Sequence, residues 1–389
     1  MFDAPPLPHY FSPEHTQFRD TLRGFVASEI SPHINDWDEA GTFPRDLYRK
    51  AAALGILGLG YPEKYGGTPA DIFYQIILAE EFARTGSGGI QASINSHTIA
   101  LPPLIAAGSE TLKRHIIPSV IAGEKIAALA VTEPSGGSDV ASLCTTAIRD
   151  GDHYVVSGEK TFITSGMRAD YLTVAVRTDP AVKGAGGISV LMIDGDTPGL
   201  TRTELKKMGW WCSDTAHLHF DHCRVPATNL VGTENRGFKT LMHNFNSERL
   251  FLSALAYGFA QVCLEEALAW AQQRKTFGHP LAERQVIRHK LMDMMLRVDA
   301  ARSLVYDLAY CIEHGRGNTE HLVARICMAK VLSTQAMQFC ADQAVQILGG
   351  MGFMRGTRSE RIYREVKVMM IGGGSEEIMK DLAARKIGI

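Results

Sequence analysis

The chain lacks the features that mark secreted, metal-binding or nucleic-acid-binding proteins. Its seven cysteines are odd in number and scattered, and none forms a CxxC pair, which argues against a disulfide framework or a zinc site. Lysine and arginine number 40 against 42 aspartates and glutamates, so the formal charge of −2 offers no basic surface for nucleic acid. Apolar residues at 45% and charged residues at 21% are typical of a globular chain, which excludes disorder over most of its length.

No segment has the pattern of a signal peptide or a membrane span. The N-terminal MFDAPPLPHYFSPEH is rich in proline, carries Asp3 and Glu14, and has no apolar stretch. The longest strongly apolar uncharged run, from Leu250 to Leu264, is shorter than the roughly 20 residues that a spanning helix needs. We therefore expect a soluble cytoplasmic protein without membrane insertion.

The 389 residues fall into three zones that differ in hydrophobic period. Residues 1–123 are typical of helices broken by glycine and proline, whereas residues 124–236 hold short β-rich runs between turn dipeptides. Residues 237–389 contain a single proline, Pro280, and return to helical periodicity. We expect a mainly α fold: an N-terminal helical domain, a small central β-barrel or sandwich, and a C-terminal helical bundle with these boundaries.

One long helix of the last zone carries a seam typical of helices packed in a bundle. Apolar residues recur along it at alternating spacings of three and four. The seam consists of Leu291, Met294, Val298, Ala301, Val305, Leu308 and Ile312.

The run VTEPSGGSD, residues 131–139, lies where helices give way to strands. Its glycines leave backbone N–H groups bare, and Thr132 and Ser138 add hydroxyls, a combination that suits a pyrophosphate. The same composition also suits a simple turn.

A second run, KTFITSG, places Phe162 and Thr164 on one face of a strand by the period of two. It is either a platform for a flat heteroaromatic ring or an ordinary strand.

Glu248 is a lone carboxylate on an otherwise apolar stripe of the helix expected after Gly237. Arg249 is about 100° further round the helix and so cannot pair with it along that face. Apolar surroundings raise a carboxyl pKa toward neutrality, as a general base requires, but the position equally suits a bridge to a Lys or Arg elsewhere. The stripe consists of Leu241, Phe245, Leu252, Leu255 and Phe259.

Three further glycine-containing runs have simple structural explanations. Gly278 in RKTFG and Gly349 in QILGG are each suited to the end of a helix. In GGGSEE, residues 372–377, Ser375 resembles a helix N-cap, although three consecutive glycines also suggest close approach of a ligand to the backbone. The cluster HLHFDHC, residues 217–223, breaks the alternation of a strand, so we expect no metal site there.

In their order and spacing these segments resemble the acyl-CoA dehydrogenase family. The matching motifs are VTEPSGGSD, TFITSG, QRKTFGHPLAERQ, AVQILGGMGF and GGGSEEIMKDLAARKI. The resemblance implies the same three-domain order with a four-helix bundle, bound FAD, and a homotetramer built as a dimer of dimers. It also implies fatty acid or branched-chain acyl catabolism, with an acyl-CoA substrate and electron-transfer flavoprotein as electron acceptor.

The resemblance assigns site residues by position. Those implied to contact the flavin within one subunit are Leu129, Val131, Thr132, Ser138, Phe162, Thr164, Ser375 and Glu377. Those implied to reach a neighbouring subunit's FAD are Arg274, Thr276, Phe277, Leu281, Gln285, Gln346 and Gly350. Those implied on the substrate side are Ser138, Asn246, Arg249 and Gly374.

The catalytic base is where this sequence departs from many relatives. Many members carry the base in the C-terminal glycine loop, at the position of Gly373, which has no carboxylate here. Long-chain and isovaleryl types place it on the helix at the position of Glu248, so the resemblance selects Glu248, with the Gly373 N–H holding the thioester carbonyl. The expected reaction gives trans-2-enoyl-CoA from medium, long or methyl-branched acyl chains. The sequence also leaves open an acyl-CoA oxidase, a flavin-dependent monooxygenase and a non-catalytic acyl-CoA-binding protein.

Overall fold

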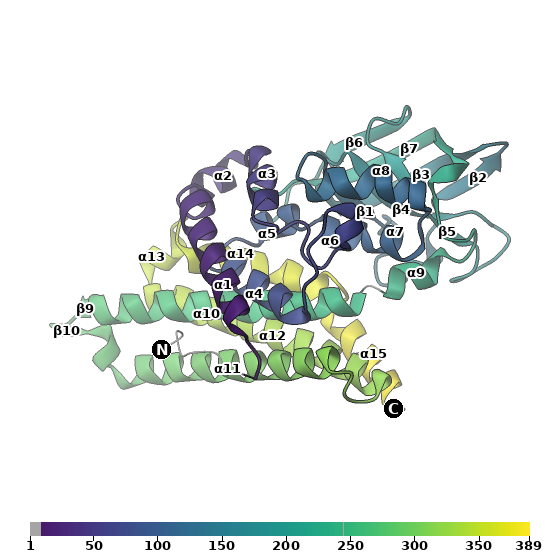
Figure 1. Ribbon diagram of the computed structural model, residues 1–389. Helices are drawn as coiled ribbons and strands as arrows, with labels where there is room; N and C mark the ends of the chain where they lie inside the picture. Colours follow the sequence, from purple (N-terminus) through teal and green to yellow (C-terminus); the bar gives the residue numbers. More distant parts are fainter. Residues whose placement is uncertain (1–8, 244) are drawn as a thin grey trace. The chain divides into compact units, whose positions relative to one another are not determined.

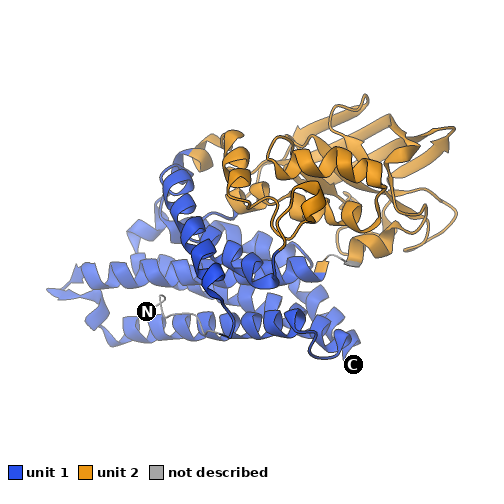
Figure 2. Cartoon of the chain, viewed as in Figure 1, with its two compact units in different colours: residues 1–36, 70–88, 246–389 blue, residues 37–69, 89–245 orange. Residues whose placement is uncertain are grey.

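The structure is a computed structural model that describes residues 9–243 and 245–389. The chain forms two compact units, coloured separately in Figure 2. The first comprises residues 1–36, 70–88 and 246–389, and the second comprises residues 37–69 and 89–245. Helices from both ends of the chain therefore share one unit. The domain boundaries expected after residues 123 and 236 stay a prediction.

The second unit is built on one continuous sheet, of eight strands among the described residues, in the order β6-β7-β3-β2-β4-β5-β8 with β1 parallel to β4 (Figure 1). Its strands are β1 (Ala127–Ala130), β2 (Thr146–Asp150), β3 (His153–Thr164), β4 (Tyr171–Arg177), β5 (Ile188–Asp194), β6 (Leu200–Glu204), β7 (Thr215–Pro226) and β8 (Leu230–Val231). The predicted mainly α fold with a central β-domain is confirmed.

The central strands β4 and β5 are buried on both faces, which explains their continuous apolar sequences. Along β4, Leu172 and Val174 belong to one hydrophobic cluster, whereas Tyr171 and Ala175 belong to another on the opposite face. The first cluster draws residues from β2, β3, β4, β5 and β7 together, so the sheet curves around it.

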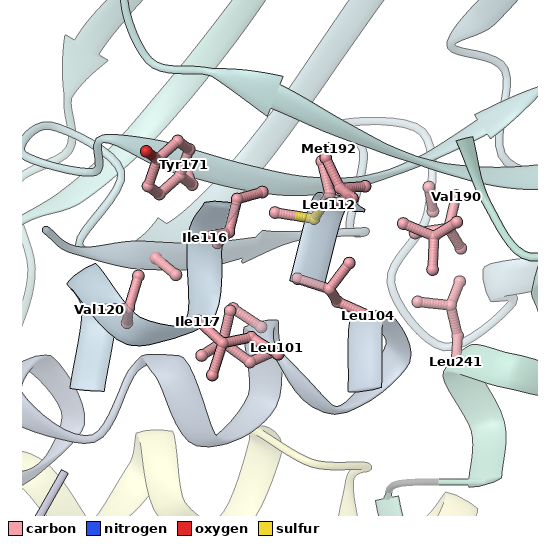
Figure 3. Close-up of a cluster of buried hydrophobic side chains, with 14 of the residues drawn as sticks. Leu101, Leu104, Leu112, Ile116, Ile117, Val120, Tyr171, Val190, Met192 and Leu241 are labelled. Carbon is pink, nitrogen blue, oxygen red and sulfur yellow. The ribbon is translucent and has the colours of Figure 1, made fainter. Parts of the chain in front are cut away.

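Helices cover the opposite face of β4 and β5. Figure 3 shows Leu104, Leu112 and Ile116 directed toward Tyr171 and Met192 of the sheet. The helices of this unit are α3 (Asp46–Ala53), α5 (Gly88–Ile94), α6 (His97–Ala100), α7 (Pro102–Ala107), α8 (Glu110–Ile121) and α9 (Gly237–His243); α2 (Ile34–Ala40) contains the boundary between the units.

The first unit is a bundle dominated by three long helices, α10 (Phe245–Gln273), α11 (Gln285–Glu313) and α12 (Thr319–Leu348), drawn lengthwise in Figure 1. Its other helices are α1 (Pro13–Phe25), α4 (Ile72–Ala83), α13 (Gly350–Phe353), α14 (Arg358–Ile371) and α15 (Glu376–Lys386), and a hairpin of β9 (Lys275–Thr276) and β10 (His279–Pro280) follows α10. The seam predicted on α11 is buried from Leu291 to Leu308. Ile312, in the last turn, is 37% exposed, so the seam ends one turn earlier than expected.

A buried carboxylate fixes α10 against its neighbours. Glu80 of α4 accepts hydrogen bonds from Tyr257 of α10 at 2.6 Å and Tyr306 of α11 at 2.5 Å, and it pairs with Arg19 of α1. Burial acts to raise the pKa of Glu80, but Arg19 and the two hydroxyls outweigh it and hold the pKa below its usual range. One charged group therefore joins four helices of the first unit.

One helical stretch among the described residues, Gly237–Gln273, is long and apolar enough to cross a membrane by length and composition. Asn244 within it lies outside the described residues, and 72% of its most apolar window is buried inside the structure. Packing within the protein accounts for this apolarity. The absence of membrane insertion and the cytoplasmic location stay predictions.

Candidate active site

Glu248 lies in the first turn of α10, half-buried at the start of the long helix. Among the side chains that the structure describes, residues 9–242 and 245–389, none forms an ion pair or hydrogen bond with its carboxylate. Burial raises the pKa of Glu248 to about 7, although the charges of Arg249 and Lys330 act to lower it. Within this part of the chain, the bridge to a Lys or Arg that the sequence left open is therefore not formed, and the carboxylate is available as a proton acceptor.

Gly373 faces Glu248 across the start of α10. A β-carbon built on Gly373 would lie 3.9 Å from Glu248 Oε1 and 2.9 Å from Leu252 Cδ1. Gly373 also has φ +68°, a left-handed conformation that favours glycine. The structure thus brings together the two positions that the resemblance associates with the base.

Two cations hold the glycine loop at residues 372–374. Arg249 Nε donates to the Gly373 carbonyl at 3.1 Å, and its Nη1 donates to Asn246 Oδ1 at 3.1 Å. Lys330 Nζ donates to the Gly374 carbonyl at 2.6 Å. Asn246, Arg249 and Gly374, predicted on the substrate side, therefore lie in one connected group.

The loop leads directly into α15. Ser375 is the N-cap of this helix, and its Oγ accepts a hydrogen bond from the Ile378 N–H at 3.4 Å, as the capping interpretation predicted. Ser375 is half-buried and Glu377 is exposed. Their assignment to the flavin stays a prediction.

In the second unit, the VTEPSGGSD loop is fastened to β3. The Thr161 N–H donates to the Thr132 carbonyl at 2.9 Å, and Lys160 Nζ donates to the Val131 carbonyl at 3.0 Å. Leu129, on β1, is half-buried and Val131 is buried. The runs VTEPSGGSD and KTFITSG, which the sequence alone does not connect, therefore lie side by side.

A buried ion pair supports this junction. Lys160 Nζ lies 2.7 Å from Glu133 Oε1, which also accepts from the Thr145 N–H at 2.9 Å. Burial acts to raise the pKa of Glu133, but the Lys160 charge and the backbone donors outweigh it, so the carboxyl stays ionised. Burial lowers the pKa of Lys160 to about 8, which leaves the ammonium charged near neutral pH.

A β-bulge interrupts the regular alternation of β3 at Phe162, which the sequence did not predict, while the expectation that Phe162 and Thr164 share one face stays a prediction. The register of β3 with β7 shifts between Lys160 and Ile163, and Phe162 has φ +59° at this bulge. A left-handed aromatic residue is unusual, and Phe162 is 70% exposed. The bulge, rather than the period of two, presents Phe162 at the surface of the second unit.

The groups at this surface fit a flat ring with an anionic tail. Phe162 is exposed, Thr164 lies two residues further along β3 and is half-buried, and Thr132 and Ser138 carry hydroxyls. A β-carbon on Gly137 would meet only Thr132 Cγ2, at 3.6 Å, so the loop has room for close approach to its backbone. These residues fit the flavin that the resemblance implies.

The Arg274–Gln285 segment forms a hairpin. Phe277 and Gly278 have φ +51° and +83°, as in a type I′ turn between β9 and β10. Gly278 therefore lies in the turn of a hairpin, and the expectation that it ends a helix is wrong. The same expectation for Gly349 is confirmed, because Gly349 is the C-cap of α12, with φ +62°. The Leu281 N–H donates to the Arg274 carbonyl at 2.8 Å, which fixes the hairpin base.

The side chains of the hairpin face outward. Phe277 is 93% exposed, Arg274 and Gln285 are exposed, and Thr276 and Leu281 are half-buried. The hairpin and Glu248 lie at opposite ends of α10, which spans about 40 Å at 1.5 Å per residue (Figure 1). The hairpin residues and Glu248 therefore do not form one site within a single chain.

Gln346 and Gly350 lie at the exposed end of α12. Phe353 follows on α13 and is 84% exposed. An aromatic ring this accessible is available for contact with another molecule.

The histidines of β7 lie along Glu159 of β3. His217 Nε2 is 3.7 Å and His219 Nδ1 is 3.5 Å from its carboxylate oxygens. Among the described residues no cluster of three or more His, Cys, Asp or Glu side chains has the arrangement of a metal site.

Lys330 and the Glu133–Lys160 pair were not predicted from the sequence. Lys330 carries the signal that identified Glu248, a charge on an apolar stripe, because Cys327, Thr334 and Met337 are buried on the same face of α12. Lys160 lies in a run that was interpreted only through its aromatic and hydroxyl residues.

The chain matches three domains of one family over most of its length. Residues 12–124, 128–223 and 235–388 match the N-terminal, middle and C-terminal domains described as acyl-CoA dehydrogenase.

Similar proteins come from several organisms. The chain is 36% identical over 380 residues to a mitochondrial long-chain specific acyl-CoA dehydrogenase of Sus scrofa, covering 97% of this chain and 87% of that protein. It resembles the crystal structure of an acyl-CoA dehydrogenase from Geobacillus kaustophilus with a TM-score of 0.93 and 36% identity, covering 98% and 99% of the two chains. A glutaryl-CoA dehydrogenase of Mycobacterium smegmatis in complex with FADH2 is similar at a TM-score of 0.91 and 25% identity, covering 98% and 96%.

Proposed function

Because this chain belongs to the acyl-CoA dehydrogenase family and is an oxidoreductase that acts on acyl-CoA, we propose that it removes the α-proton and a β-hydrogen of an acyl-CoA thioester with Glu248 as the base. The products are the trans-2-enoyl-CoA and the reduced cofactor. The observation that carries the proposal is the Glu248 carboxyl beside Gly373, with a pKa of about 7 and no partner among the described side chains of residues 9–242 and 245–389.

Glu248 accepts the α-proton on a carboxylate oxygen. A base whose pKa is close to the working pH is substantially ionised and still binds the proton strongly. Burial raises the pKa of Glu248 into this range, and the nearby cations Arg249 and Lys330 keep that pKa from rising further.

Gly373 stabilises the negative charge that develops on the thioester oxygen as the α-proton leaves. Its backbone N–H donates to that oxygen in the proposed arrangement, as the family resemblance implies. Arg249 and Lys330 hold the following carbonyls, so the loop is preorganised before substrate arrives. Asn246, Arg249, Gly374 and Ser138 would lie on the substrate side.

The family is FAD-dependent, and the exposed groups of the second unit are suited to that cofactor. When bound, FAD supplies the acceptor for the β-hydrogen as hydride. Thr132, Ser138, Phe162 and Thr164 would hold its ring and phosphates, with Leu129 and Val131 behind them. Ser375 and Glu377 would hold it from the glycine loop.

We also propose a homotetramer, a dimer of dimers, in which one subunit completes its neighbour's cofactor site. The hairpin is too far from Glu248 along α10 to serve the same chain's site. Exposed Phe277 and Phe353 would be covered by assembly. The residues that would reach the neighbour are Arg274, Thr276, Phe277, Leu281, Gln285, Gln346 and Gly350.

The proposed substrates are medium to long or methyl-branched acyl-CoAs in fatty acid or branched-chain catabolism. The long-chain specific relative supports longer chains. The position of the carboxylate on α10 rather than at Gly373 supports the same choice over glutaryl-CoA, since the family resemblance associates the helix position with long-chain and isovaleryl types. Electron-transfer flavoprotein is the proposed electron acceptor.

An anaerobic spectral titration of the purified holoprotein tests this function. A panel of straight and branched acyl-CoAs, from four to about sixteen carbons, is added and the oxidised flavin band is followed. The proposal predicts bleaching by a subset of the panel, and that subset defines the acyl group. A flavin band that no acyl-CoA bleaches would instead favour a monooxygenase.

Two further measurements distinguish a dehydrogenase from an oxidase and from a non-catalytic protein. Aerobic turnover with equal peroxide and no need for a protein acceptor would identify an oxidase. A colourless protein that cannot be reconstituted with FAD would identify a non-catalytic acyl-CoA-binding protein.

A further inference from the structure

Lys330 is a fully buried cation in the middle of α12. Burial of an ammonium group costs free energy unless hydrogen bonds and charges compensate it. The contacts of Lys330 therefore show which interactions offset the burial of its charge and which part of the chain they hold in place.

Lys330 bonds to both ends of the glycine loop. Its Nζ donates to the carbonyl of Met370, in the last turn of α14, at 3.1 Å and to the carbonyl of Gly374 at 2.6 Å. A positive charge is favourable at the C-terminus of a helix, where carbonyls lack intrahelical partners. One ammonium group thus ties the end of α14 to the residue that follows Gly373.

Arg249 holds the loop from the other side. It donates to the Gly373 carbonyl, so two consecutive carbonyls are each held by a cation from a different helix. Because a peptide group is planar, fixing these carbonyls fixes the two peptide planes that follow Gly373, and the bond to Met370 anchors the chain before it, so the 372–373 peptide group with the Gly373 N–H is held between two anchors. Gly373 and Gly374 have φ +68° and +110°, and neither has a side chain to restrict its backbone.

Lys330 also belongs to the charge cluster around the base. The groups that act on it are Glu248 and Arg249 of α10, Glu376 of α15 and Cys327 of α12. Burial lowers the pKa of Lys330 to about 8, so its ammonium is charged near neutral pH. That charge favours the ionised form of Glu248.

We propose that Lys330 is a positioning residue for dehydrogenation, which restrains the segment carrying the Gly373 N–H through its bonds to the Met370 and Gly374 carbonyls on either side of it, without contacting substrate. Its charge also acts on the base in the direction already described. This inference rests on the proposed function. It separates into a hydrogen-bonding role and a charge role, and two substitutions distinguish them.

Lys330→Met removes both the donors and the charge, whereas Lys330→Gln keeps donors without charge. In anaerobic single-turnover reduction, Lys330→Met is expected to slow flavin reduction about tenfold or more, with affinity for the enoyl-CoA product changed by less than about threefold. Lys330→Gln is expected to recover most of that rate. In both variants the midpoint of the pH profile shifts upward, because the charge that favours the Glu248 carboxylate is gone.

Thr334→Val is the matched control on the same helix. Thr334 is buried one turn from Lys330, and within the described part of the chain its hydroxyl donates only to the α12 carbonyls of Lys330 and Val331, at 2.9 and 3.2 Å. This substitution disturbs the packing of α12 to a similar degree but leaves the glycine-loop bonds in place. Its reduction rate and pH midpoint are expected to match the wild type.

Amide hydrogen exchange provides a measurement independent of turnover. Peptides that contain residues 371–375 are expected to exchange about tenfold faster in Lys330→Met than in Thr334→Val, because the loop has lost one of its two anchors. This comparison needs no substrate. In Lys330→Gln, which keeps hydrogen-bond donors, the same peptides are expected to exchange at close to the rate of Thr334→Val.

The outcomes distinguish this inference from the function on which it rests. Wild-type rate, pH midpoint and loop exchange in Lys330→Met would overturn the role of Lys330 while acyl-CoA still bleached the flavin. If no acyl-CoA reduced even the wild-type flavin, the proposed function and this role would both be wrong.

Discussion

Glu248 Oε1 lies 3.9 Å from the point where a β-carbon on Gly373 would stand. The two residues are 125 positions apart in the chain, on the first turn of α10 and in the loop before α15. A carboxylate attached at either position would therefore reach the same small region. This geometry explains how members of one family can carry the base on different elements.

Moving the carboxylate to the loop should restore part of the activity. Glu248→Ala alone removes the proton acceptor, and addition of Gly373→Glu is expected to raise the rate of flavin reduction about tenfold or more above Glu248→Ala. Recovery is incomplete because Leu252 Cδ1 lies 2.9 Å from the new β-carbon and the backbone is left-handed.

Glu248→Ala combined with Gly373→Gln is the matched control, since it adds the same bulk without a base. If the Glu and Gln double variants reduced flavin equally slowly while both retained flavin, the shared reach of the two positions would be refuted.

The stability of the protein should depend on pH through Glu248. Its folded-state pKa of about 7 lies above the ordinary value of 4.5, so the unfolded chain loses this proton first as the pH rises. The contribution of Glu248 to the free energy of unfolding is fully present below the pKa that its carboxyl has in the unfolded chain. It is lost as the pH rises through the pKa of the same carboxyl in the folded protein. Glu248→Gln should therefore be more stable than wild type by about 1 kcal/mol at about pH 8, with partial exposure allowed for, and by less at about pH 5. Thermal unfolding of both holoproteins measures this; a difference that does not grow with pH would contradict it.

The buried pair in the second unit should make a large contribution to stability. Lys160→Met leaves the Glu133 carboxylate buried without its counter-charge and is expected to cost about 3 kcal/mol or more. Lys206→Met, which breaks the exposed pair with Glu204 at 2.8 Å, should cost about 0.5 kcal/mol or less. Chemical denaturation of the three proteins compares the two costs, and equal losses would show that burial of the Lys160 pair has no special effect.

Helix periodicity and family motifs predicted much of this protein, but they did not predict local backbone geometry. The α11 seam follows from spacing alone because each buried residue lies on one helical face. The role expected of Gly278 was wrong because a two-residue hairpin turn follows the helix there, and the bulge at Phe162 was not predicted because the interpretation assumed a regular strand period.

Long-range polar contacts were also beyond the sequence. The pattern on α12 marks Lys330 as unusual, but it gives no indication that the ammonium reaches carbonyls 40 and 44 residues away. Likewise, the pKa of Glu248 depends on burial and on a cation from another helix. The sequence shows which residue types are present, whereas the residues that contact them can be identified only from the three-dimensional structure.

The exposed hairpin should mediate assembly. Phe277→Ser is expected to lower the molar mass of the proposed tetramer in light scattering and to increase flavin loss during purification, because an apolar contact is removed from the interface. Ile148→Ser, at an apolar side chain of β2 that is 49% exposed, is the control and should leave the mass unchanged. A wild-type protein that is monomeric with a full complement of flavin would contradict the shared cofactor site.

The central claim is that Glu248 removes the substrate proton, and anaerobic stopped-flow reduction of Glu248→Gln tests it most directly. With an acyl-CoA that bleaches the wild-type flavin, we expect reduction slowed by about a thousandfold, while the variant still binds flavin and the acyl-CoA. Reduction of Glu248→Gln at close to the wild-type rate would contradict the assignment and require a different base.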